Sequence, residues 1–144
     1  MATHIGFGGM MKNKSLAADY INRAGNRLQA VEKLMELKSF ADVVRESQEL
    51  IELCLKGVLR ISNVEVPRLH DVGDVLVQSK TKLPKEIKIH AEQLAKISKK
   101  LRRDRELAFY GTEDLTPSDF YKEEDAKEAL DDASWVHSIC KEAL

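Results

Sequence analysis

The sequence is poor in the residues that make turns, and this scarcity favours helices. Its 144 residues include only 7 glycines and 3 prolines, and aromatic residues make up 6% of the chain. A sandwich or barrel contains many short strands and many turns, and this composition is thin for either of them. We therefore expect a helical protein.

Charge of one sign and long apolar runs are also missing. The 23 basic and 24 acidic residues leave a net charge of -1, so composition does not imply the usual strongly basic nucleic-acid binder, and any anion site must be local. No apolar run is long enough to span a bilayer, and we expect no membrane partner. With 43% hydrophobic and 33% charged residues, the chain fits one globular domain.

The two cysteines and the N-terminal segment give little sign of chemistry. Cys54 and Cys140 form neither a metal-binding spacing nor a disulfide framework, and both fall on helical apolar stripes, which favours buried, reduced thiols. We expect no basic leader in the segment from Met1 to Met11, whose short apolar stretch is interrupted by glycines. We expect a disordered start over 1–14 and a cytoplasmic protein.

Apolar residues recur at three- and four-residue steps along most of the remaining chain. This periodicity predicts an all-α fold, an up-and-down bundle of four long helices plus one short helix, within a single domain over 15–144. The second helix is the most apolar and should be central. The expected helices cover about 15–38, 39–63, 71–78, 84–108 and 116–143.

Arg105 is the residue that breaks the pattern. The stripe of the fourth long segment steps by four and three through Ile87, Ala91, Leu94, Ser98 and Leu101, and it then reaches Arg105 and Ala108. An unpaired buried charge costs several kcal/mol or more, so the guanidinium must either pair with an acid such as Glu52 or open onto a cleft. In a cleft, its fork of donors matches phosphate.

Six basic residues lie within ten positions of this segment, and the net charge conceals them. Such a run is most often a solvated face. Because this one ends in Arg105, we expect a surface that attracts phosphates. The six are Lys96, Lys99, Lys100, Arg102, Arg103 and Arg105.

The second helix carries a polar stripe of Arg45, Glu49, Glu52 and Lys56 at helical spacing, with Gln48 beside it. A solvated face is the simplest interpretation of such a stripe. An apolar Leu53 within it points to contact with another subunit.

The last helix carries a second candidate dimer surface. Its inward stripe of Ala126, Leu130, Ala133, His137 and Cys140 leaves Trp135 and Ile139 on the opposite side, where they make a candidate dimer patch. The alternative is that they pack across the neighbouring turn of the same chain.

The catalytic templates fail. The four histidines, His4, His70, His90 and His137, are too scattered for a metal-binding helix motif, and no glycine-rich phosphate loop follows a strand. His70 should join a loop to a helix, and His137 should lie in the core. We expect neither a metal nor a cofactor.

Four segments, in order, resemble the HEPN family of small helical domains, which are often linked to nucleotide binding. Residues 47–59 resemble its Gln, Glu and Lys pattern, although Leu53 replaces the Lys that often follows the Glu. Residues 67–72 resemble its loop into the short helix, 105–111 its Arg-centred signature, and 121–126 the opening of its last helix. The similarity spans about 15–143.

The resemblance implies two alternatives. Many HEPN proteins are metal-independent ribonucleases, often toxins, in which an Arg is followed after four to six residues by a His, and two copies meet in a homodimer cleft. Here Arg105 and Glu106 match, but the His positions hold Tyr110, Gly111 and Thr112. A phenol with a pKa near 10 is a poorer general base at neutral pH than imidazole near 6.5. Other HEPN proteins accompany a minimal nucleotidyltransferase.

Three hypotheses follow from this sequence. The first is a cytoplasmic homodimer that binds a nucleotide or RNA phosphate near Arg105, with Tyr110, Lys56 and Glu52 as cleft neighbours, and that partners a nucleotidyltransferase in a toxin–antitoxin-like system. The second is a divergent metal-independent ribonuclease toxin that uses Arg105 for transition-state charge. The third is a non-catalytic structural adaptor that binds another chain through Leu53 and Trp135.

Overall fold

The computed structural model describes the backbone of residues 7–66 and 71–144, and the side chains of 13–66, 71–102 and 110–144. Within these ranges it contains helices and no strand, which confirms the all-α prediction. The elements are α1 (Phe7–Glu36), α2 (Phe40–Ile61), α3 (Val72–Gln78), a 3-10 turn (Lys80–Lys82), α4 (Lys85–Lys88), α5 (Ala91–Tyr110), α6 (Pro117–Phe120) and α7 (Glu123–Glu142).

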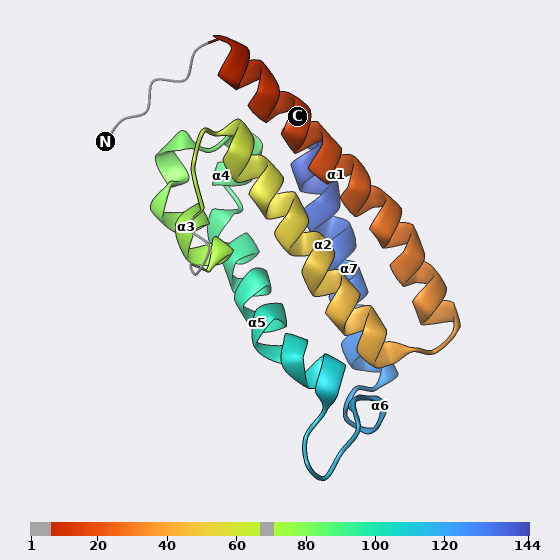
Figure 1. The fold of residues 1–144 in the computed structure, drawn as a ribbon. Coiled ribbons are helices and arrows are strands. Elements are labelled where there is room, and N and C mark those ends of the chain that lie inside the picture. The colour runs from red at the N-terminus through yellow and green to blue at the C-terminus, as the bar shows by residue number, and fades with distance from the viewer. Residues whose placement is uncertain (1–6, 67–70) are drawn as a thin grey trace.

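Four long helices, α1, α2, α5 and α7, run alternately down and up to form the bundle, and α2 lies among the other three (Figure 1). The short helices α3 and α4 close one end, and α6 lies at the opposite end. No helix in the described part of the chain has both the length and the apolar character that a membrane crossing requires.

The central position of α2 follows from its sequence. Apolar residues occur around most of its circumference, so the helix can bury surface against α1, α5 and α7 at once. Its buried side chains are mostly apolar: Val43, Val44, Leu50, Ile51, Cys54, Leu55, Val58 and Leu59. The second predicted helix is thereby confirmed as the centre of the bundle.

The first helix begins earlier than predicted. The sequence pattern placed its start at Ser15 and a disordered segment over 1–14, but α1 already begins at Phe7. The prediction was wrong for residues 7–14, and residues 1–6 lie outside the described part. At the other end the helix stops before Lys38, whose φ of 59° lies in the left-handed region.

The predicted fourth and fifth helices are each interrupted. A turn at Ile89 and His90 separates α4 from α5. A second break separates the single turn α6 from α7, because the Asp125 carboxylate accepts a hydrogen bond from the Lys122 backbone N–H at 2.9 Å and thereby starts a new helix. The bundle therefore has more short helices than the one expected from the sequence.

The connection from α5 to α6 folds tightly back on itself. Gly111 has a φ of 80°, and a Cβ at this position would lie 2.5 Å from the Leu115 carbonyl oxygen. The Thr112 N–H donates to that same oxygen at 2.9 Å, and the Leu115 N–H donates to the Thr112 Oγ1 at 3.2 Å. Only a glycine fits this position without strain.

Candidate functional site

The backbone of Arg105 lies in α5, on the predicted stripe. Five earlier positions of that stripe, Ile87, Ala91, Leu94, Ser98 and Leu101, are all buried, as predicted. The side chains of residues 103–109, and with them that of Arg105, lie outside the described residues. The described part of the stripe thus leads directly to the position predicted to bind phosphate.

Glu52, the acid named above as a pairing partner for Arg105, is engaged by a different arginine. Its Oε1 lies 3.8 Å from Nη1 of Arg102, and its side chain is only 13% exposed. Arg102 precedes Arg105 by three residues, so this ion pair joins α2 to α5 about one helical turn before the predicted site.

Lys56 and Tyr110 lie apart along the bundle. From the Glu52–Arg102 contact, Lys56 is four residues further along α2, and Tyr110 is eight residues further along α5. Because the two helices run in opposite directions (Figure 1), these steps add to an axial separation of about 18 Å. The structure does not bring these two predicted neighbours of one cleft together.

Three of the four described basic side chains in the run of α5 form ion pairs with other helices. Lys99 Nζ lies 2.7 Å from the Asp74 carboxylate of α3, and this hydrogen bond raises the pKa of Lys99. Lys100 pairs with Glu128 of α7, and Arg102 pairs with Glu52. Lys96 is exposed and makes no ion pair with any residue whose side chain is described. These cations attach α5 to its neighbours.

Gln48 is a buried residue that the sequence analysis placed beside a solvated stripe. It is only 1% exposed, and neither amide atom has a hydrogen-bond partner among the described residues. Its spacing could have revealed this, because Val44, Gln48, Ile51 and Leu55 follow steps of four, three and four. The hydroxyls of Ser47 and Ser98 are likewise buried and unpartnered in the described structure. Such groups normally bind protein atoms or an ordered water.

The candidate dimer residues pack within a single chain. Ile139 is only 8% exposed and belongs to the core, so the prediction that it faces outward was wrong. Trp135 and Leu53 are half-buried against the same core, and the Trp135 ring meets the His90 ring edge to face at 5.2 Å. The alternative of packing within the chain therefore accounts for Ile139 and much of Trp135.

The two cysteines and His137 are held by contacts within the bundle. Both thiols are buried and free, as predicted. A hydrogen bond with Cys54, together with burial, raises the pKa of Cys140 well above its usual value, and a thiol in this state is a poor nucleophile. His137 Nε2 lies 3.1 Å from the Ile21 carbonyl oxygen, close to the core as expected. His70 lies outside the described residues, and the described side chains contain no cluster of potential metal ligands.

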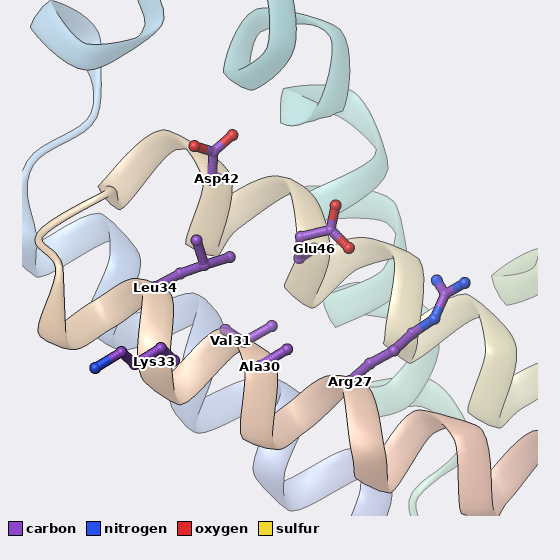
Figure 2. A pocket seen from close by; sticks show the side chains of 7 residues that line it. All are labelled: Arg27, Ala30, Val31, Lys33, Leu34, Asp42 and Glu46. Atoms are coloured by element: carbon purple, nitrogen blue, oxygen red, sulfur yellow. The ribbon is translucent and has the colours of Figure 1, made fainter.

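A shallow cavity of about 340 Å³ lies between α1 and α2, away from the predicted site. Figure 2 shows Arg27 and Lys33 on the α1 side and Asp42 and Glu46 on the α2 side, above an apolar floor that includes Val31. None of the predicted site residues lines it.

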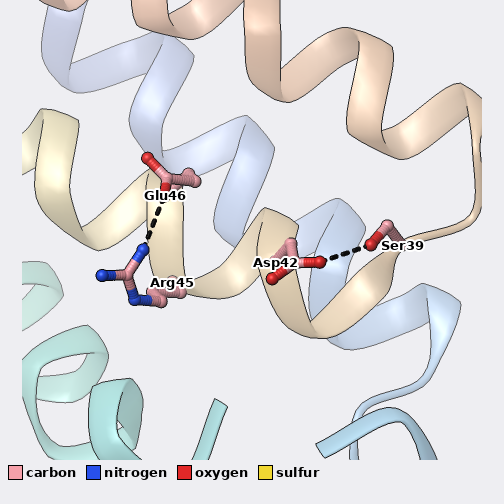
Figure 3. A network of polar contacts seen from close by, with 4 residues as sticks. All are labelled: Ser39, Asp42, Arg45 and Glu46. Carbon is pink, nitrogen blue, oxygen red and sulfur yellow. Dashed lines mark hydrogen bonds and ion pairs between the residues drawn. The ribbon is translucent and has the colours of Figure 1, made fainter. Parts of the chain in front are cut away.

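The carboxylates beside this cavity already have partners. Figure 3 shows the Ser39 hydroxyl donating to Asp42 at 2.6 Å and Arg45 Nη1 pairing with Glu46 at 2.7 Å. The Ser39 side chain binds the Asp42 side chain and does not cap the helix backbone, so these two residues, although spaced like a capping box, do not form one.

Comparison with known proteins agrees with the resemblance noted in the sequence. The family model of the HEPN domain matches residues 17–143, which is most of the chain. The chain belongs to the HEPN family. No curated protein and no solved structure shows significant similarity to it. Membership in the HEPN family supports a function related to nucleotides or RNA in general.

Proposed function

We propose that this HEPN protein binds the phosphate of a nucleotide or of RNA at the C-terminal half of α5, with Arg105 as the principal ligand. The proposal includes a homodimer in which two such sites share a cleft, and a nucleotidyltransferase as protein partner in a toxin–antitoxin-like system. The family match supports the nucleotide-related part of the proposal.

The observation that carries the proposal is the burial of the stripe that runs from Ile87 of α4 along α5 to Leu101, before Arg105. All five earlier positions named above are buried, and Arg105 follows Leu101 by four residues on the same stripe. Glu52, the acid nearest in the sequence argument, already pairs with Arg102. An arginine that continues an apolar stripe needs an anion, and a phosphate suits its planar set of donors.

The residues beyond Arg105 favour binding over cleavage. Family ribonucleases place a His four to six residues after the Arg, whereas this chain has Tyr110 at the shortest of these spacings. Tyr110 is 73% exposed at the last turn of α5, and an aromatic ring at such a position can stack on an unpaired base. A phenol does not replace imidazole as a proton shuttle at neutral pH.

Calorimetric titration with AMP, ATP and short single-stranded RNA tests this function. We expect binding by the wild type and a loss of about tenfold to a hundredfold in affinity for Arg105→Ala, the size of lost hydrogen bonds to a charged group. Lys96→Ala is the matched control, because it removes an equal charge from an exposed position of the same helix. The control should change affinity less than twofold.

Two results would overturn the proposal. Equal losses for Lys96→Ala and Arg105→Ala would mean that the affinity comes from diffuse charge. Metal-free RNA cleavage that disappears in Arg105→Ala would establish the ribonuclease hypothesis instead. Light scattering of the wild type tests the homodimer separately, and a monomer at the concentration used for titration would remove the shared cleft.

A further inference from the structure

Exposed apolar side chains gather at the α6 end of the bundle. Tyr110, Leu115 and Phe120 are 73%, 43% and 42% exposed, whereas the other large exposed apolar side chains in the described structure are scattered along the chain. The end of α5 and α6 are in contact, since a Cβ on Gly111 would lie 2.8 Å from Pro117 Cδ. We call Tyr110, Leu115 and Phe120 the end patch. Clustered exposed aromatic and aliphatic residues mark interaction sites.

The backbone that carries the end patch is held in one conformation. Gly111 closes the connection onto Leu115, as described above. The Thr116 hydroxyl accepts from the Asp119 N–H at 3.2 Å, and the Asp119 carboxylate accepts from the Thr116 N–H at 3.3 Å. Tyr121 is buried beneath, and its ring meets that of Phe120 at 5.0 Å. A preorganised surface of this kind loses little entropy on binding.

The surroundings of the end patch are strongly acidic. Residues 111–125 contain six carboxylates and one lysine, and all seven of these side chains are exposed. Two of the carboxylates, Asp119 and Asp125, also bind the helix starts. The remaining four face solvent without an ion pair among the described side chains: Glu113, Asp114, Glu123 and Glu124.

We infer that the end patch docks a second protein through a surface that combines apolar residues with lysine or arginine. The carboxylates around the patch complement a basic protein partner. A second copy of this chain fits less well, because three of the basic residues of its α5 are already paired internally. This inference deepens the partner role proposed above and rests on it, but it does not depend on phosphate binding.

Site-specific photo-crosslinking in the cells that make the protein tests this surface. In one variant of the full chain, p-benzoylphenylalanine replaces Leu115. In a second variant, the control, it replaces the exposed Gln29 of α1. We expect an adduct with another protein from position 115 only. Mass spectrometry of the adduct should show a crosslinked peptide with at least two basic residues beside apolar ones.

Charge reversal then tests the complementarity. Glu113→Lys with Asp114→Lys should reduce the adduct at least tenfold, whereas Glu32→Lys with Glu142→Lys, at exposed positions elsewhere, should leave it unchanged. Circular dichroism checks that each variant retains its helices. Tyr110 is left intact because it belongs to both proposals.

Four outcomes overturn the inference: an adduct with a second copy of the chain, an adduct with RNA, a partner peptide without basic residues, or no adduct from position 115. Arg105→Ala separates the two proposals, since it should weaken phosphate binding by about tenfold to a hundredfold and leave the adduct intact. Loss of the adduct in Arg105→Ala would contradict the inference that partner docking at the end patch is independent of phosphate binding.

Discussion

The contacts of α1 and the contacts of α5 are built from different chemistry. Where α1 meets α2 and α7, small residues let the helices approach closely: a Cβ on Gly25 would lie 3.0 Å from His137 Nε2, and one on Gly57 would lie 3.4 Å from the Ala17 carbonyl oxygen. By contrast, α5 adds ion pairs to its apolar stripe, and these reach α2, α3 and α7.

Because of this difference, we expect salt to weaken the contacts of α5 and to leave the contacts of α1 with α2 and α7 unchanged. Apolar contacts do not weaken as the ionic strength rises, whereas the attraction within an exposed ion pair decreases as salt screens it. The helix that carries Arg105 is therefore the one whose attachment responds to ions.

Replacing Leu55 of α2 tests the apolar half of the comparison. Leu55 is fully buried, so Leu55→Ala should lower the free energy of unfolding by about 2–5 kcal/mol through lost burial and the cavity left behind. Urea denaturation measures the change. Leu37→Ala, at an exposed position after α1, should change it by less than about 0.5 kcal/mol. Comparable losses in both variants would contradict the description of α2 as the centre of the core.

The apolar contacts of the fold were predictable from the sequence, because apolar residues at helical spacing indicate which face of a helix is buried. The central place of α2, the extent of α3 and the buried stripe from Ile87 to Leu101 all follow from spacing. The start of α1 was missed because its first residues include two glycines, which lower helix propensity without forbidding a helix.

Replacing Gly111 tests the tight connection between α5 and α6. Its φ is 80°, and a Cβ added there would lie 2.5 Å from the Leu115 oxygen, so Gly111→Ala should cost about 1–3 kcal/mol. Thermal unfolding followed by circular dichroism measures the loss. Ser118→Ala in α6, at an exposed position, is the control and should shift stability by about 0.5 kcal/mol or less. A neutral Gly111→Ala would mean that the turn can relax and that the end patch is not preorganised.

The ionic half of the comparison could not be predicted from spacing. Positions along one helix do not show which acid on another helix a lysine meets, so the pairs Lys99–Asp74 and Lys100–Glu128 required the tertiary structure. For the same reason Glu52 was named as a partner of Arg105, although it pairs with Arg102. The sequence predicted the helix that carries Arg105 and the buried stripe that precedes it. It did not predict that Glu52 pairs with Arg102.

A double-mutant cycle on Glu52 and Arg102 sharpens the ionic half. Because Glu52 is largely buried, Glu52→Gln and Arg102→Gln should show a coupling of about 0.5–1 kcal/mol that falls as salt rises. The pair Lys33–Glu36 on α1 is exposed at both ends and should give only about 0.2–0.5 kcal/mol. Urea titrations at two salt concentrations provide both numbers. A larger coupling on α1 would reverse the contrast between the two helices.

The smallest effect concerns Asp132, on α7 near the Lys100–Glu128 pair. Burial, and then repulsion by Glu128, raises the pKa of Asp132 above its usual 3.8, so the folded state loses stability as pH rises through the range above 3.8. Asp132→Asn should therefore be more stable than wild type at pH 7, and the difference should vanish below pH 3.8, where the carboxyl is protonated in both states. Asp131→Asn, at its exposed neighbour, should gain less. An equal gain in stability for Asp132→Asn at every pH would mean that packing around residue 132, and not the charge of Asp132, lowers the stability of the wild type.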